Sequence, residues 1–168
     1  LECVNTMDFR LGETESWFEK AFSYVQRFIA EGGYRLYPDM VSLPVSVNGG
    51  QDVTIVHRWR NMGWGYCPTN IKAWNQKYKV AFALLNDNNE VKKIFVDEQS
   101  DLSTWLKEAP TTYTTKLSMK GVSVGAYSWA VGLVDVTKDN EIGLEMAVNQ
   151  DDNLLNSGWL KLKTITVN

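Results

Sequence analysis

The pattern of hydrophobic and polar positions divides the chain into two parts near residue 33. Residues 13–31 carry apolar side chains at spacings of three and four, which is the period of one face of an α-helix. The members of this face are Trp17, Phe18, Ala21, Phe22, Val25, Phe28 and Ile29. From residue 34 onward the period shortens to two, as in half-buried β-strands. The pattern predicts one amphipathic helix in residues 1–33 and a β-rich domain in residues 34–168.

Both ends of the predicted helix carry capping signals. Ser16 and Glu19 have the spacing of a capping box, and Gly32 with Gly33 supplies a left-handed stop. An apolar face with this many aromatic rings is too large to stay exposed. We therefore expect it to pack against the rest of this chain or against a neighbouring domain.

The second part contains up to nine short strands, separated by turns rich in Asn, Asp and Gly. The expected strands are 34–37, 40–47, 52–61, 78–86, 91–97, 113–119, 125–136, 144–148 and 158–167. Longer connections lie at 63–76 and 98–112, and residues 100–106 suit a single helical turn. Many short strands without a second helical pattern predict a mainly β fold, an antiparallel Ig-like or jelly-roll-type β-sandwich.

The stretch 57–68 is the most informative part of the sequence, because it contains the only histidine. It lies partly in the predicted strand 52–61. Alternation places His57 and Trp59 on one face of that strand, where we expect them to be in the core. Trp129 and Trp159 also alternate within predicted strands and are expected in the core.

Composition limits the classes of function. The chain has 168 residues, enough for one main core, and its net charge of −3 gives no general attraction to nucleic acid or anionic membrane. From this charge we expect no nucleic-acid partner. The chain also has no apolar run long enough to span a bilayer, so we expect no membrane span. The start, Leu-Glu-Cys-Val-Asn, carries neither Met nor a signal-peptide pattern, so we expect a processed product or a fragment of a longer polypeptide. Cys3 and Cys67 are compatible with one disulfide or with two free thiols.

No pattern of a catalytic or metal site is present. A glycosidase needs two facing carboxylates, and the candidate acids Glu13, Asp97, Glu98 and Asp101 are better explained as helix caps or solvated charges. His57 has no nucleophile motif around it, and P-loop, dinucleotide-binding and zinc spacings are all missing. Acidic and amide side chains at 87–89 and 151–153 are explained by turns without calcium. We expect no catalytic residue, no metal and no cofactor.

The aromatic residues of the two long loops are candidates for a binding surface. Sugars stack on exposed Trp or Tyr rings while amides and carboxylates take the hydroxyl groups. The residues that combine these properties are Trp64, Tyr66, Trp74, Trp105, Asn61 and Asp101. A large loop aromatic also folds back over the end of a sheet or packs on a neighbouring domain. Both interpretations remain open from the residues.

Four runs carry a family resemblance. They are Gly-Gly-Tyr-Arg-Leu at 32–36, Val-Thr-Ile-Val-His-Arg-Trp-Arg at 53–60, Asn-Met-Gly-Trp-Gly at 61–65 and Lys-Val-Ala-Phe-Ala-Leu-Leu at 79–85. Over residues 30–168 the chain resembles an uncharacterised carboxy-terminal β-sandwich domain that follows a TIM barrel in large secreted bacterial proteins related to glycoside hydrolases. The resemblance implies that residues 1–33 are the end of that barrel, with 17–29 as its outer helix.

The resemblance also implies a location outside the cytoplasm, secreted, periplasmic or at the cell surface, and a function. The chain would be a non-catalytic accessory domain of a carbohydrate-active protein, packing against the barrel and binding polysaccharide through its loop aromatics. One alternative is a structural interdomain module without a ligand. A second is a fragment that carries part of a glycosidase active site.

Overall fold

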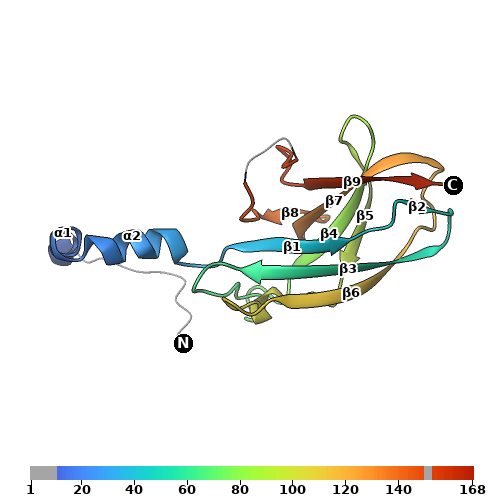
Figure 1. Ribbon diagram of the computed structural model, residues 1–168. Helices are drawn as coiled ribbons and strands as arrows, with labels where there is room; N and C mark the ends of the chain where they lie inside the picture. The colour runs from blue at the N-terminus through green and yellow to red at the C-terminus, as the bar shows by residue number, and fades with distance from the viewer. Residues whose placement is uncertain (1–10, 150–152) are drawn as a thin grey trace.

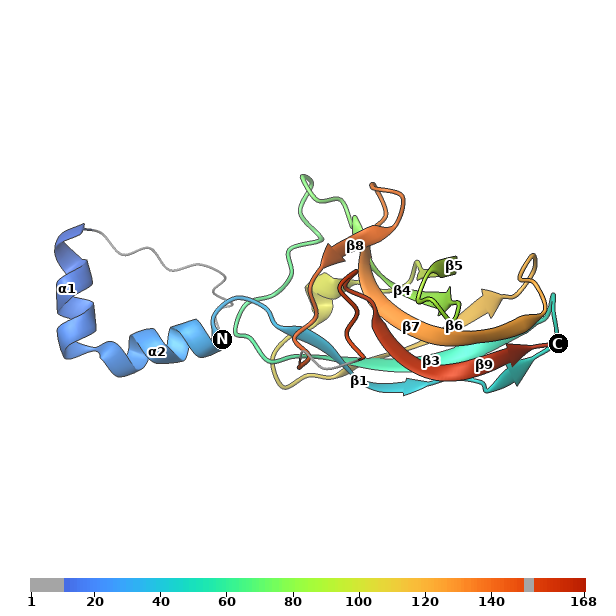
Figure 2. The ribbon, with the colours of Figure 1, turned by 90° about the horizontal axis from the view of Figure 1, so that it is seen from above.

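The computed structural model describes residues 11–149 and 153–168. Within these residues the chain forms two helices, nine strands and one short 3-10 turn. The helices, α1 (Leu11–Lys20) and α2 (Phe22–Glu31), form a bent arm that projects from one end of the β domain (Figures 1 and 2). The rest of the chain folds into two packed sheets.

The smaller sheet has three strands in the order β1-β3-β6. They are β1 (Leu36–Ser42), β3 (Asp52–Asn61) and β6 (Thr111–Ser118). Both strand pairs are antiparallel, with Val41 opposite His57 and His57 opposite Tyr113. Because β3 is the central strand and ten residues long, its two ends define the two ends of the domain.

The larger sheet has six strands, with five in the order β2-β9-β7-β4-β5 and β8 paired to β7. They are β2 (Ser46–Val47), β4 (Tyr78–Leu85), β5 (Val91–Asp97), β7 (Gly125–Asp135), β8 (Glu141–Leu144) and β9 (Leu160–Val167). Pairing is antiparallel except between β2 and β9. The predicted mainly β, antiparallel Ig-like sandwich with a helical segment before it is confirmed.

The core lies between the two sheets, with a second apolar layer on the outer face of the larger one. Trp59, Trp129 and Phe82 are fully buried in the first layer. Trp159 packs over the alanines of β4 and β7 in the second layer. The central strands β4 and β7 are thus buried on both faces, and the predicted core positions of Trp59, Trp129, Trp159 and His57 are confirmed.

The prediction of a single helix over 13–31 is wrong. The helix is interrupted at Ala21, whose φ of −136° and ψ of 27° leave the helical range. The interruption loses little hydrogen bonding, because the Ala21 N–H still donates to the Trp17 carbonyl at 3.0 Å and the Val25 N–H to the Ala21 carbonyl at 3.3 Å. The Ser16–Glu19 capping box is also wrong, since Ser16 lies inside α1. The left-handed stop is present at Gly33, with φ of 68°.

Candidate functional site

The arm meets the sandwich at Asn61, the last residue of β3. Its buried amide forms four hydrogen bonds: Oδ1 accepts from the N–H groups of Arg35 and Gly63, both at 2.9 Å. Nδ2 donates to the carbonyl oxygens of Gly65 at 2.6 Å and Trp105 at 3.0 Å. One side chain therefore ties together the segment after α2, the turn after β3 and the loop that contains Trp105.

The turn after β3 lies directly against the end of α2. The Trp64 N–H donates to the Glu31 carbonyl at 2.8 Å, and the Gly65 N–H donates to the Gly33 carbonyl at 2.7 Å. A Cβ atom at Gly63 would lie 2.1 Å from the Gly33 carbonyl oxygen, closer than atoms can approach. Glycine at position 63 is thus required by the contact between turn and helix.

The Trp64 side chain lies among charged groups from both parts. The Arg27 guanidinium lies 5.0 Å from the centre of the indole ring, and the Lys107 ammonium lies 5.4 Å from it. Lys107 also forms an ion pair with Glu31. The hydrogen bond from Lys107 lowers the pKa of the Glu31 carboxyl against an opposing desolvation, and the charges of Lys107 and Arg27 lower it further.

Arg35 completes the attachment by capping the helix. Its guanidinium donates to the carbonyl oxygens of Ala30 at 2.8 Å and Ile29 at 2.6 Å. Carbonyls in the last turn of a helix have no partner within the helix. A cation there also interacts favourably with the negative end of the helix dipole. We call the set Arg27, Glu31, Arg35, Asn61, Gly63, Trp64 and Lys107 the arm joint.

A hollow of about 410 Å³ opens beside the arm joint. Its lining comes from α2, β1, β3 and the loop after the 3-10 turn η1 (Leu102–Thr104), and consists of Glu31, Tyr37, Arg60, Asn61, Met62, Lys107 and Glu108. Met62 is more than half exposed in this place. The hollow therefore offers apolar and charged surface together, where the arm leaves the sandwich.

The apolar face of α2 is mostly open to solvent. Of the ten residues of α2, all of them described, Val25 alone is buried. Phe22 and Ile29, one helical turn away on either side of Val25, are 47% and 65% exposed, and Tyr24 is 67% exposed. Of the two expected kinds of packing, the one within this chain buries only Val25 of α2, and packing against a neighbouring domain stays a prediction.

Trp105 does not lie on a binding surface. It is 0% exposed, stacks on Trp59 with ring centres 4.9 Å apart, and donates its indole N–H to the Tyr113 hydroxyl at 2.8 Å. Asn61 is buried and has its amide committed to the arm joint. Both were expected to contact a ligand, and the structure contradicts both assignments. The cause is that the loop folds back over the end of the sheets.

Asp101 likewise holds the loops together. Its Oδ1 accepts hydrogen bonds from the side chains of Thr69 and Gln76 and from the N–H and hydroxyl of Ser103. Through the Ser103 N–H, Asp101 caps the start of η1. Burial raises the pKa of the Asp101 carboxyl, but the hydrogen bonds from Ser103, Gln76 and Thr69 outweigh it and the net pKa is lowered. This carboxylate is an internal acceptor that links the 63–76 loop to the 98–112 loop.

The other predicted aromatics remain partly exposed but separate. Trp74 is half-buried, meets the edge of Tyr78 at 5.3 Å between ring centres, and has the Lys77 ammonium 5.3 Å from its own ring centre. Tyr66 is also half-buried. The lining of the hollow at the arm joint includes Asn61 but none of the predicted aromatics. The structure therefore does not bring the six residues into one surface.

His57 belongs to a buried polar chain that the sequence did not reveal. The Trp59 indole N–H donates to His57 Nδ1 at 2.8 Å, so Nδ1 is an acceptor and the ring proton lies on Nε2. Nε2 donates in turn to the Asp97 carboxylate at 3.1 Å. Both groups are buried, and the third member is a tryptophan without nucleophilic chemistry. The chain is therefore a structural element of the core.

Cys67 is buried near Tyr34 and Asp101 and has no disulfide partner among the described residues, and burial raises its pKa to about 12 despite a hydrogen bond with Tyr34. Cys3 lies outside the described residues, so the choice between one disulfide and two free thiols is not tested. Among residues 11–149 and 153–168 no group of three or more His, Cys, Asp or Glu side chains could hold a metal ion. No helix in the same residues is long and apolar enough to cross a membrane.

Comparison with known proteins gives a likeness of fold only. No family model matches the chain, and no curated protein matches its sequence. Among solved structures, the CARDB domain of a Pyrococcus furiosus protein in complex with di-metal ions aligns with a TM-score of 0.42 at 13% identity, over 80% of this chain and 89% of that one. The C-terminal domain of Wzt aligns with a TM-score of 0.40 at 10% identity, over 81% and 71%.

A Niemann-Pick type C2 protein from the Japanese carpenter ant aligns with a TM-score of 0.36 at 2% identity, over 80% of this chain and 92% of that one. Similarities at this level do not bear on function. The functional argument therefore depends on the arm joint and the open face of α2.

Proposed function

We propose that the chain is a non-catalytic accessory β-sandwich domain that holds a neighbouring domain of the same polypeptide through its helical arm. The observation that supports this most is the contrast within α2. Its C-terminal end is fixed to the sandwich by the arm joint, while Phe22 and Ile29 on its apolar face stay open. A helix that is anchored at one end and apolar along its side is suited to docking.

The energy available from such docking is substantial. Full burial of a Phe or Ile side chain is worth about 1.5–3 kcal/mol, and both Phe22 and Ile29 are about half exposed or more. The hollow beside the arm joint adds Met62 and the charged groups of Arg60 and Lys107 at the point where the arm leaves the sandwich. A surface with an apolar centre and a charged border is typical of contacts between domains.

The neighbour that we propose is the barrel of a glycoside-hydrolase-like protein, because residues 30–168 resemble the domain that follows such a barrel. In this proposal residues 1–33 pass from the barrel to the sandwich. A location outside the cytoplasm belongs to the same proposal.

Docking is favoured over glycan binding at the loop aromatics. Trp105 and Asn61 are buried, and the Trp64 ring is already in contact with the Arg27 and Lys107 cations. A sugar ring that stacked on Trp64 would compete with these cations. The loops therefore serve as the support of the arm in this proposal, and the polysaccharide is a ligand of the neighbouring barrel.

The test uses a longer polypeptide that includes the proposed barrel. Ile29→Asp places a charge on the docking face, and Ser23→Asp places the same charge on the exposed side of α2 away from Val25 and Ile29 as the matched control. We expect the parent and Ser23→Asp proteins to unfold in one calorimetric transition and Ile29→Asp to unfold in two. One shared transition in all three proteins contradicts the proposal.

A second measurement addresses docking between two copies. Sedimentation of the 168-residue chain should show a monomer, and a dimer that Ile29→Asp dissociates would show that the open face binds a second copy instead of a barrel.

A further inference from the structure

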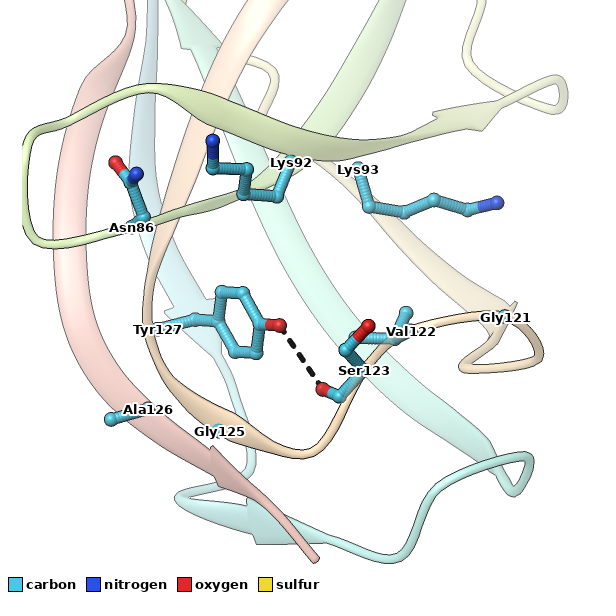
Figure 3. A pocket seen from close by; sticks show the side chains of 9 residues that line it. All are labelled: Asn86, Lys92, Lys93, Gly121, Val122, Ser123, Gly125, Ala126 and Tyr127. Carbon is cyan, nitrogen blue, oxygen red and sulfur yellow. Dashed lines mark hydrogen bonds between the residues drawn. The ribbon is translucent and has the colours of Figure 1, made fainter.

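A second hollow, of about 400 Å³, lies at the end of the sandwich away from the arm. The arm meets β3 at Asn61, whereas the loop that forms this hollow follows Ser118, which pairs with Asp52 at the opposite end of β3. Figure 3 shows the ring of Tyr127 in the middle, between the β4–β5 hairpin with Lys92 and Lys93 and the loop with Val122 and Ser123. The hollow is therefore independent of the arm joint.

The strand register explains why a hollow exists here. Lys93 of β5 pairs with Leu84 of β4, and Leu84 pairs with Trp129 of β7. Leu84 and Trp129 belong to the core between the sheets, so Lys93 is on the inner face of the larger sheet. The smaller sheet has only three strands, and the exposure of Lys93 shows that it does not cover this edge. The inner face is thus open beyond the end of β4, between the start of β5 and the start of β7.

Positive charge collects in this opening, although the chain as a whole is acidic. Lys93 is exposed and forms no ion pair with any residue of the described ranges. Lys92 pairs with Glu90 at 2.7 Å, but both side chains are largely exposed, and a pair of this kind contributes little and can exchange its partner. Lys120 lies in the turn that precedes the loop. The border of the hollow therefore attracts an anion.

The floor of the hollow suits a ring. The Tyr127 hydroxyl donates to the Ser123 carbonyl at 3.0 Å, which fixes the orientation of the aromatic ring before any ligand arrives. Val122 adds apolar surface, and Ser123 adds a hydroxyl that donates and accepts hydrogen bonds. The volume falls in the range of small-ligand sites, and an aromatic face beside polar groups is suited to a pyranose ring.

We propose that this hollow binds an anionic saccharide, with the sugar ring on Tyr127 and its carboxylate or sulfate between Lys92 and Lys93. The assignment goes beyond the docking role, because the two sites lie at opposite ends of the domain. Another explanation of Lys93 is that an inward-pointing lysine on an edge strand prevents pairing with a second chain. The experiment separates the two.

The experiment is calorimetric titration of the 168-residue protein with three probes. These are a galacturonic acid hexamer, its fully methyl-esterified neutral form and a heparin-derived hexasaccharide. We expect one or both anionic probes to bind and the neutral ester not to bind, and the preferred probe identifies carboxylate or sulfate as the recognised group. Lys93→Gln should weaken binding about tenfold, while Lys163→Gln, which removes an exposed charge on β9, should leave the affinity unchanged.

The proposal is overturned if none of the probes binds, if the methyl ester binds as well as the acid, or if Lys93→Gln and Lys163→Gln lose affinity equally. Self-association of Lys93→Gln in sedimentation, together with no binding by the parent protein, also overturns it and assigns Lys93 to edge protection. Because the arm is untouched in these variants, failure here is distinct from failure of the docking proposal.

Discussion

The sandwich and the arm differ in how far their aromatic side chains are buried. In the sandwich, Trp59, Trp105 and Trp129 are fully buried, and the indole N–H of each has an acceptor. The helix α2 also contains aromatic residues, but its Phe22 and Tyr24 are exposed. Two packed sheets can bury each other's inner faces, whereas two ten-residue helices in a bent arm have little to pack against. The sandwich therefore buries its own aromatic residues, and the arm leaves most of its apolar face exposed.

The arm joint connects these two regions. Asn61, Arg35 and the Glu31–Lys107 ion pair fix the end of α2 with groups that are polar or charged. An apolar hinge would bury the arm against the sandwich, but this joint holds the helix at its end and leaves its side open (Figure 2). The difference between the regions can therefore be tested by changing the core, the arm joint and the arm in turn.

The largest effect is expected in the core of the sandwich. Trp59→Ala removes a fully buried ring together with its stacking on Trp105, and should lower the free energy of unfolding by about 3–5 kcal/mol. Phe22→Ala removes a ring from the arm and should change it by no more than about 0.5 kcal/mol in the same chain. Urea unfolding of both variants measures the comparison. Equal losses would show that the arm is part of the core.

A smaller effect is expected at the arm joint. Asn61→Ala leaves four backbone groups without their partner, and should cost about 2–3 kcal/mol. Hydrogen exchange should increase at Gly63 and Gly65 and in the last turn of α2, while the strands β4 and β7 keep their protection. If exchange increases evenly over the sandwich, Asn61 is a core residue and not the link to the arm.

The smallest effect is a pH dependence of the arm joint. The pKa of Glu31 is lower in the folded chain than its usual value of 4.5, so its contribution is complete above pH 4.5 and is lost as the pH falls through the lowered pKa. We expect the indole N–H resonance of Trp64 to shift only below pH 4.5. Glu31→Gln should abolish this shift. A midpoint above 4.5, or an unchanged titration in the variant, contradicts the ion pair with Lys107.

Much of the β domain could be predicted because its signals are local. The alternation in 52–61 gave the strand β3, its ends and its buried face, and Asn-rich turns marked the ends of β4 and β5. The break at Ala21 had no such signal, since alanine is the strongest helix former.

The arm joint could not be predicted for a different reason. Glu31 and Lys107 are 76 residues apart, and nothing in either neighbourhood indicates the other. The orientation of the Trp105 side chain could not be predicted either. A loop aromatic points to solvent or to the sheet according to contacts that form only in the folded chain. The sequence identified the loop at Asn61–Gly65 as a contact surface for a sugar or for a neighbouring domain, whereas its contacts in the structure are with the end of α2 and the residues that follow it.

The most direct test of the docking proposal is oxidative footprinting of Phe22, Tyr24 and Trp64 in the 168-residue chain and in the longer polypeptide with the barrel. Phe22 and Tyr24 are both exposed in the chain alone, but Tyr24 lies about 160° away from Phe22 around the helix axis. Trp64 is half-buried beside the Arg27 and Lys107 cations. We predict that the longer polypeptide lowers the oxidation rate of Phe22 several-fold and leaves those of Tyr24 and Trp64 nearly unchanged. An equal rate for Phe22 in the two proteins would contradict the account.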